Sequence, residues 1–70
     1  MKQKTVLTAA HKAAITGGIK AAVTFLMEDS GKGFTEAVTA IGAAIKAGLL
    51  EGTPHRLVTL TEKGRHALVA

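Results

Sequence analysis

The chain contains no cysteine, no tryptophan and no tyrosine, and its only aromatic residues are two phenylalanines. Without cysteine, neither a disulfide framework nor a cysteine-based zinc site can stabilise the fold. Without tyrosine or tryptophan, a platform on which single-stranded bases stack is not expected. A chain of 70 residues therefore depends on tight helix packing or on self-association for its stability.

Long apolar runs and catalytic constellations are lacking as well. The apolar-looking stretch 13–27 is interrupted by Thr16, Gly17, Gly18 and Lys20, and it is too short to span a membrane. The basic start of the chain is not followed by the apolar segment of a secretory signal, so we expect a cytoplasmic protein. The histidines show no metal-ligand spacing, and no nucleophile with its base is visible. We expect no membrane association, no metal, no cofactor and no enzymatic activity.

Acidic residues are few relative to basic ones. Five Asp and Glu face nine Lys and Arg, which gives a formal net charge of +4. This excess favours a polyanionic partner such as nucleic acid, although a protein that merely happens to be basic is the alternative. The basic residues are spread along the chain rather than gathered in a tail. Lys2 and Lys4 are candidates for an N-terminal arm.

The first half of the chain predicts two helices or one bent helix. Thr8 is a candidate N-cap. An apolar stripe spaced four, four and three follows at Ile15, Ile19, Val23 and Leu26. Gly17 and Gly18 fall within this stripe, and two glycines cost about 2 kcal/mol relative to alanine in a helix interior. We predict a bend or break there, with a second helix over about 19–28. One long helix approached closely by another backbone is the alternative.

The strongest helical pattern comes after the loop at 28–33. Apolar residues spaced four, three, four and four occur at Phe34, Val38, Ile41, Ile45 and Leu49. Thr35 is a candidate N-cap, Glu36 suits the positive end of the helix dipole, and Gly48 fits a C-terminal stop. We expect Phe25 and Phe34 to lie in the core.

A short β-hairpin and a final helix complete the prediction. Thr53 and Pro54 indicate a turn between the apolar segments 49–50 and 57–60. Within the second strand, Val58 and Leu60 share one face, and Leu57 and Thr59 share the other. The last helix begins at Thr61 and frays before Ala70. The sequence thus predicts one α+β, mainly α, domain over residues 1–70.

Two segments of the C-terminal half carry a family resemblance. The letters AGLLEG at 47–52 and VTLTEKGRHAL at 58–68, with a hairpin between them, resemble the winged helix-turn-helix domains of bacterial transcription regulators, particularly the MarR-like group. The resemblance covers about Val38 to Leu68, and the N-terminal half matches only in helix count. It implies that the third helix is a recognition helix and that the hairpin is a wing, followed by a C-terminal helix.

The chain departs from the family in two ways. Its wing, 51–56, is shorter and less basic than is usual. Its third helix also holds few of the Arg, Lys, Asn and Gln side chains that read base edges best. Lys32, just before that helix, is placed to meet a phosphate. The predicted nucleic-acid-binding residues are Lys32, Thr35, Thr39, Lys46, His55 and Arg56.

Two functions follow as hypotheses. The first is a small protein that binds double-stranded DNA as a transcriptional regulator or architectural factor. A homodimer would double its phosphate contacts. The second is a protein-interaction module on the same scaffold, such as a small phage or mobile-element protein that binds and modulates a host protein. Small residues recur on two ridges, which fit either tight internal packing or a self-association face: Ala14, Gly18 and Ala22, and Ala40, Ala44 and Gly48.

Overall fold

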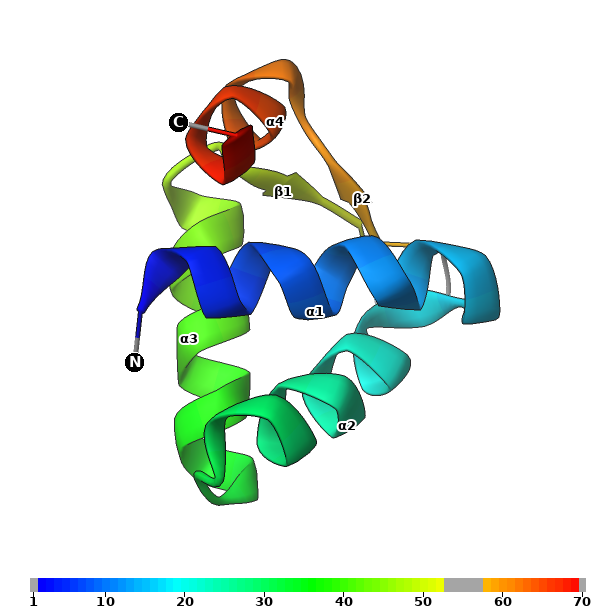
Figure 1. Cartoon of the computed structure of the whole chain (residues 1–70), viewed down its shortest axis with the longest axis vertical. Coiled ribbons are helices and arrows are strands. Elements are labelled where there is room, and N and C mark those ends of the chain that lie inside the picture. Colours follow the sequence, from blue (N-terminus) through cyan, green and yellow to red (C-terminus); the bar gives the residue numbers. More distant parts are fainter. Residues whose placement is uncertain (1, 53–57, 70) are drawn as a thin grey trace.

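A computed structural model describes residues 2–52 and 58–69. Its elements are α1 (Gln3–Thr16), α2 (Gly18–Ser30), α3 (Phe34–Lys46), β1 (Leu50–Glu51), β2 (Thr59–Leu60) and α4 (Glu62–Val69). The described part is mainly helical with a small antiparallel sheet, as the sequence predicts. In Figure 1, α1 crosses α3, α2 lies beside the N-terminal part of α3, and β1, β2 and α4 gather at its other end.

The start of α1 differs from the prediction. Thr8 lies inside the helix and does not cap it, because its Oγ1 donates a hydrogen bond to the Lys4 carbonyl oxygen at 2.8 Å. The N-cap position is Lys2, whose side chain makes no capping hydrogen bond. A threonine within a helix can bond to the carbonyl four residues back, so its presence alone does not identify a helix start.

The predicted break at the glycine pair is confirmed. Gly17 and Gly18 have φ values of 106° and 78°, a region that residues with a side chain rarely adopt. The chain turns there, and α2 packs back against α1, where Lys12 Nζ lies 3.0 Å from Asp29 Oδ2. Ile15 is 85% exposed. The apolar stripe that was expected to run through both helices therefore excludes Ile15 and is confined to α2.

The core lies where α1, α2 and α3 meet the β1–β2 segment, and alanine contributes much of it. Alanine lets neighbouring backbones approach closely, so that a small chain can still pack densely. Ala22 and Ala44, from the two small-residue ridges, are buried within the protein. Phe25 packs against the core as expected and is partly buried. The buried apolar residues are Val6, Leu7, Ala9, Ala10, Ala13, Ala22, Val23, Leu26, Ala37, Ile41, Ala44, Leu49, Leu50 and Val58.

The orientation of α3 corrects a second prediction. Its buried residues are Ala37, Ile41 and Ala44, whereas Phe34 is 64% exposed and Val38 is 41% exposed. The expectation that Phe34 lies in the core is therefore wrong. The helix buries Ile41 between two alanines, and its first large apolar residues lie at the side.

The two ends of α3 are closed by hydrogen bonds. Gly33, not Thr35, is the N-cap residue, and Glu36 Oε2 accepts a hydrogen bond from the Gly33 N–H at 3.0 Å. This places the Glu36 carboxylate at the positive end of the helix, as predicted. At the other end Gly48 has a φ of 81°. The Gly48 N–H donates to the Ile45 carbonyl oxygen at 3.0 Å, and the Leu49 N–H donates to the Ala44 carbonyl oxygen at 2.9 Å. These two bonds together form a Schellman motif.

The predicted hairpin is present as two very short strands. β1 and β2 pair antiparallel, with Leu50 opposite Leu60 and Glu51 opposite Thr59. Val58 is buried and Thr59 is exposed, as the predicted alternation requires. The predicted turn at Thr53 and Pro54, and Leu57, lie outside the described residues.

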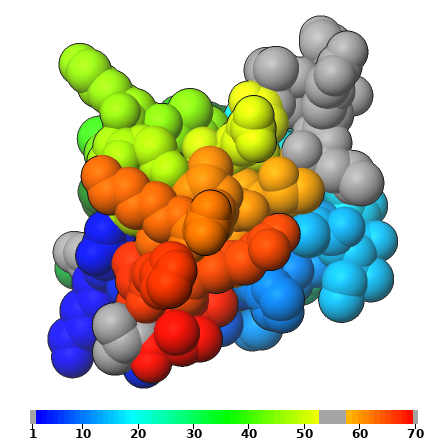
Figure 2. Space-filling view, turned by 90° about the horizontal axis from the view of Figure 1, so that it is seen from above, coloured from blue at the N-terminus to red at the C-terminus, as the bar shows by residue number. Residues whose placement is uncertain are grey.

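The junction of 47–49 with 61–64, here called the α3–α4 joint, is tightly bonded. Thr61 caps α4 as predicted, since its Oγ1 accepts from the Gly64 N–H at 3.1 Å. The same hydroxyl donates to Gly48 O, and the Thr61 N–H donates to Leu49 O at 3.1 Å. A Cβ at Gly64 would overlap the Leu49 carbonyl oxygen. Figure 2 shows α4 packed across this end of the molecule, between α1 (blue) and the C-terminal part of α3 (green).

The described helices are short, and the longest, α1, has 14 residues. None of the helices within 2–52 and 58–69 combines the length and the apolar character needed to cross a membrane.

Candidate nucleic-acid interface

One side of α3 is open to solvent along its whole length. Successive residues of an α-helix are rotated by about 100°, which sets Thr35, Thr39, Gly42 and Lys46 on the side opposite the buried stripe. All four are exposed. We call these four residues the exposed α3 face. It unites three of the predicted nucleic-acid-binding residues on one line of one helix.

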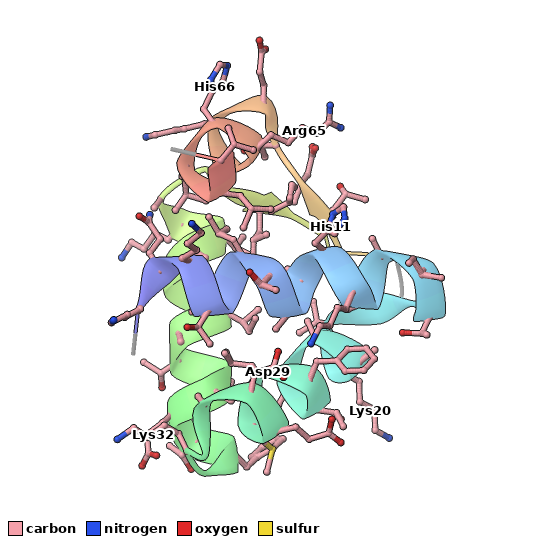
Figure 3. All side chains as sticks on the ribbon, in the orientation of Figure 1. His11, Lys20, Asp29, Lys32, Arg65 and His66 are labelled. Carbon is pink, nitrogen blue, oxygen red and sulfur yellow. The ribbon has the colours of Figure 1, made fainter. Side chains whose placement is uncertain are left out.

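Lys32 stands at the N-terminal end of this face. It is exposed in the short connection between α2 and α3, and its backbone N–H donates to Ser30 Oγ at 3.2 Å. Together with Thr35 and Thr39 it lines a shallow open groove. Figure 3 shows its side chain at the end of α3 farthest from α4. Lys32 and Lys46 thus flank the 13 residues of α3, which span about 20 Å.

Two of the polar side chains between these lysines, Glu36 and Thr39, already make hydrogen bonds to the backbone of α3 or of its N-cap residue. Thr39 Oγ1 donates to the Thr35 carbonyl oxygen at 2.9 Å, so the hydroxyl hydrogen of Thr39 is already used. Glu36, which lines the same groove, bonds the Gly33 N–H at 3.0 Å. Its negative charge lies in the first turn of α3, so it opposes part of the attraction that Lys32 and the helix N-terminus offer to a phosphate at that end.

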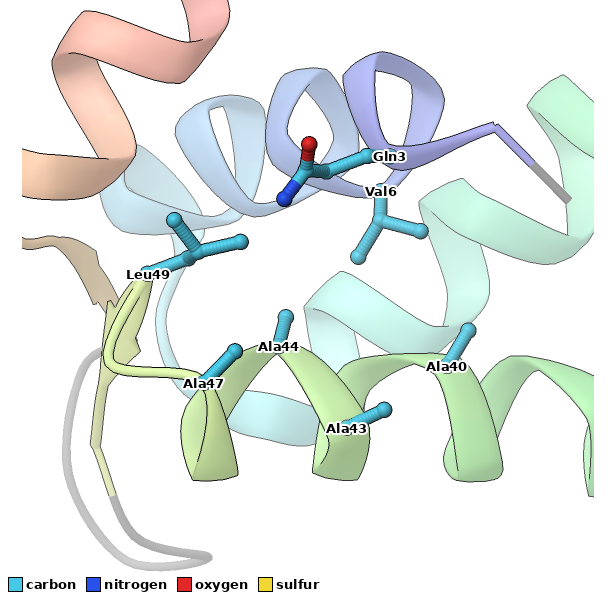
Figure 4. Close-up of a pocket in the computed structure, with 7 residues that line it drawn as sticks. All are labelled: Gln3, Val6, Ala40, Ala43, Ala44, Ala47 and Leu49. Carbon is cyan, nitrogen blue, oxygen red and sulfur yellow. The ribbon is translucent and has the colours of Figure 1, made fainter.

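A second groove runs along the other flank of α3, where α3 faces the start of α1 (Figure 4). The groove is mostly apolar, and Gln3 supplies the polar side chain among its lining residues. Ala40 and Ala43 line both grooves and form the ridge between them. This lining offers methyl groups rather than charge. The lining residues are Gln3, Val6, Ala40, Ala43, Ala44, Ala47 and Leu49.

Lys63 is a basic residue of this region that sequence reasoning missed. It belongs to α4, yet its Nζ donates to the Ala47 carbonyl oxygen at 3.3 Å, at the C-terminal end of α3. Lys46 is the residue before Ala47, so two cations serve the same end of α3. The Thr61 cap places Lys63 in the first turn of α4, but its closeness to α3 depends on the α3–α4 joint, which local sequence does not reveal.

The remaining predicted residues are His55 and Arg56 of the wing and Lys2 and Lys4 of the N-terminal arm. His55 and Arg56 lie outside the described residues. Lys4 is part of α1, so the N-terminal arm for which Lys2 and Lys4 were candidates does not include Lys4. Within residues 2–52 and 58–69, no group of three potential metal-ligating side chains lies together.

The sequence and the structure were compared with known proteins. Neither the protein-family models nor the curated proteins nor the solved structures gave a match. The chemistry of α3 and of its two ends is therefore the basis for a functional assignment.

Proposed function

We propose that the chain is a small cytoplasmic DNA-binding protein of the winged helix-turn-helix type, acting as a transcriptional regulator or architectural factor. In this proposal α3 is the recognition helix, and β1 and β2 form the base of a short wing. The order of elements supports it. So does the three-residue connection 31–33 between α2 and α3, in which Gly31 has a φ of 70°, because helix-turn-helix units use short glycine-containing turns.

The observation that carries this proposal is the exposed α3 face with cations at both ends. A major groove about 12 Å wide admits a single α-helix, whose side chains then meet base edges while basic residues hold the phosphates on either side. Lys32 lies at one end of α3, and Lys46 and Lys63 lie at the other. This spacing suits contact with both walls of the groove.

A homodimer forms part of the same proposal. The three lysines would neutralise only a few phosphates, and each phosphate contact adds a limited, salt-sensitive contribution to affinity. Two copies on adjacent half-sites would double these contacts. Light scattering with and without duplex measures the oligomeric state directly.

The decisive test is binding to a fluorescently labelled duplex of random sequence, followed by anisotropy at increasing salt. We expect the logarithm of the association constant to fall linearly with the logarithm of salt concentration, with a slope of about −0.9 for each phosphate contacted. Lys46→Glu should lower the affinity and reduce that slope by about one. Absence of binding at low salt would refute the proposal.

The matched control is Lys20→Glu. It makes the same change in net charge, but Lys20 is exposed on α2, and Figure 3 shows it on the far side of the molecule from Lys32. We expect it to leave the salt slope nearly unchanged. An equal loss in both variants would show that the total charge, and not α3, determines binding.

A protein-interaction module is the second candidate, because α3 also exposes large apolar side chains. Phe34 is 64% exposed and Val38 is 41% exposed, and aromatic residues are enriched where proteins contact each other. A small phage or mobile-element protein that binds a host protein would use such a surface. In that case Phe34→Ala should abolish partner binding, whereas Lys46→Glu would have little effect.

A further inference from the structure

We propose that the exposed α3 face selects thymine-rich duplex DNA by contacting the 5-methyl groups of thymine in the major groove. This inference rests on the proposed function, and it adds the class of sequence that the helix would prefer. It follows from which polar groups are engaged, which methyl groups are exposed, and where the helix lacks a side chain.

The exposed α3 face has few hydrogen-bonding groups that can contact base edges. Direct reading relies on Arg, Lys, Asn or Gln donors, or on carboxylates that accept from cytosine. On the exposed α3 face Lys46 alone belongs to these types, and it lies at the helix end. The Thr39 hydroxyl donates to Thr35 O, and the Glu36 carboxylate accepts from Gly33 N–H. Apart from the oxygens of the threonine hydroxyls, the middle of the helix therefore offers no group that distinguishes the polar edges of the bases.

Exposed methyl groups, in contrast, are present along this side of α3. Thr35, Thr39 and Ala43 are exposed and carry a methyl group each, and Val38 beside them is 41% exposed. In the major groove thymine is marked by its 5-methyl group, and alanine and threonine methyl groups make apolar contact with it. The cations at the two ends of α3 complement the phosphates that border such a groove.

Gly42 lies at the centre of the exposed α3 face. A Cβ built there has no described atom within 4 Å, and Gly42 is not among the glycines with positive φ. Neither packing nor backbone conformation therefore requires glycine at this position. A missing side chain lets the backbone approach a ligand closely. The centre of α3 can thus lie deep enough for the short Thr39 and Ala43 methyl groups to reach the bases.

The test compares two duplexes of identical sequence, one with thymine and one with uracil at every thymine position. Uracil pairs like thymine but has no 5-methyl group. Burial of one methyl group corresponds to about a fourfold change in affinity. We therefore expect the uracil duplex to bind roughly fourfold more weakly for each thymine methyl group that α3 touches. Replacing cytosine by 5-methylcytosine should conversely strengthen binding.

Two variants of Thr39 locate the effect on α3. Thr39→Val keeps a methyl group at the same place and removes the hydroxyl, while Thr39→Ser keeps the hydroxyl and removes the methyl. Thr39 is exposed, so both variants should fold. We expect Thr39→Val to keep the preference for thymine over uracil and Thr39→Ser to reduce it. A preference that follows the hydroxyl instead would overturn the inference.

The outcomes separate this inference from the proposed function. Salt-dependent binding of equal strength to the thymine and uracil duplexes overturns methyl reading and leaves DNA binding in place. No binding to either duplex at low salt overturns the proposed function and the inference with it. A thymine preference that shrinks in Thr39→Ser supports both.

Discussion

Gly64 in α4 and Gly42 in α3 are both helical glycines, and their surroundings differ completely. A Cβ at Gly64 would overlap the Leu49 carbonyl oxygen, whereas a Cβ at Gly42 would meet no described atom within 4 Å. The α3–α4 joint is therefore determined by packing and by the hydrogen bonds of Thr61. At Gly42 the exposed α3 face has no such packing constraint, so its side chains are accessible for contact with a ligand.

The largest effect is expected from Gly64→Ala. The added methyl group must push α4 away from the end of α3, and overpacking of this kind costs about 1–3 kcal/mol, occasionally more. Because Leu49 contributes backbone rather than a movable side-chain tip, we expect about 3 kcal/mol. Urea unfolding followed by circular dichroism measures the change. Unaltered stability would mean that Gly64 does not lie against the Leu49 carbonyl group as described.

A smaller loss of stability is expected from Thr61→Val, which keeps the shape of the side chain and removes its hydroxyl. The variant can form neither the bond from the Gly64 N–H nor the bond to Gly48 O. Removal of an N-cap typically costs about 1 kcal/mol, and up to about 2. Thr61→Ser retains the hydroxyl and serves as the control. If both variants are destabilised equally, the hydroxyl does not act as a cap.

On the open side, Gly42→Ala should increase stability. Glycine costs about 1 kcal/mol relative to alanine within a helix, and the new methyl group would enter open space. We expect a gain of about 0.5–1 kcal/mol in the free energy of unfolding, measured beside Gly64→Ala under identical conditions. A loss of stability in Gly42→Ala would remove the contrast between the two glycines.

The smallest effect is expected from Phe34→Ala. A buried phenylalanine replaced by alanine costs about 3–5 kcal/mol, but Phe34 is 64% exposed. We expect a change within about 0.5 kcal/mol. Leu26→Ala is the comparison, since Leu26 is fully buried and its truncation should cost about 2–5 kcal/mol. Similar destabilisation of the two variants would return Phe34 to the core.

The parts of the fold that sequence predicted have local causes. Gly48 stops α3 through its positive φ, and Thr61 caps α4 through the bond from the Gly64 N–H, three residues further along the chain. The glycine pair at 17–18 likewise breaks a helix by its own backbone preference. The prediction of Thr8 as an N-cap was wrong because a threonine hydroxyl can also donate to the carbonyl oxygen four residues back within a helix.

The face that α3 buries was not predictable in the same way. Periodicity indicated that the large apolar residues Phe34 and Val38 face the core. The buried residues are instead Ala37, which precedes Val38, and Ala44, whose small side chains allow closer packing. In an alanine-rich helix, hydrophobicity alone does not choose between two such stripes. The alignment of Thr35, Thr39 and Lys46 was foreseen as a set, while the contribution of Lys63 required the tertiary contact with Ala47.

The bonded end of α3 has an electrostatic consequence. The C-terminus of a helix normally presents bare carbonyl oxygens that carry about half a negative charge and repel anions. Here the oxygen of the C-cap residue Ala47 accepts from Lys63 Nζ, and the carbonyls of Ala44 and Ile45 in the last turn accept from the N–H groups of Leu49 and Gly48. The ammonium groups of Lys63 and Lys46 thus oppose the negative pole of α3, so this helix end carries less net negative charge than a helix C-terminus without cations.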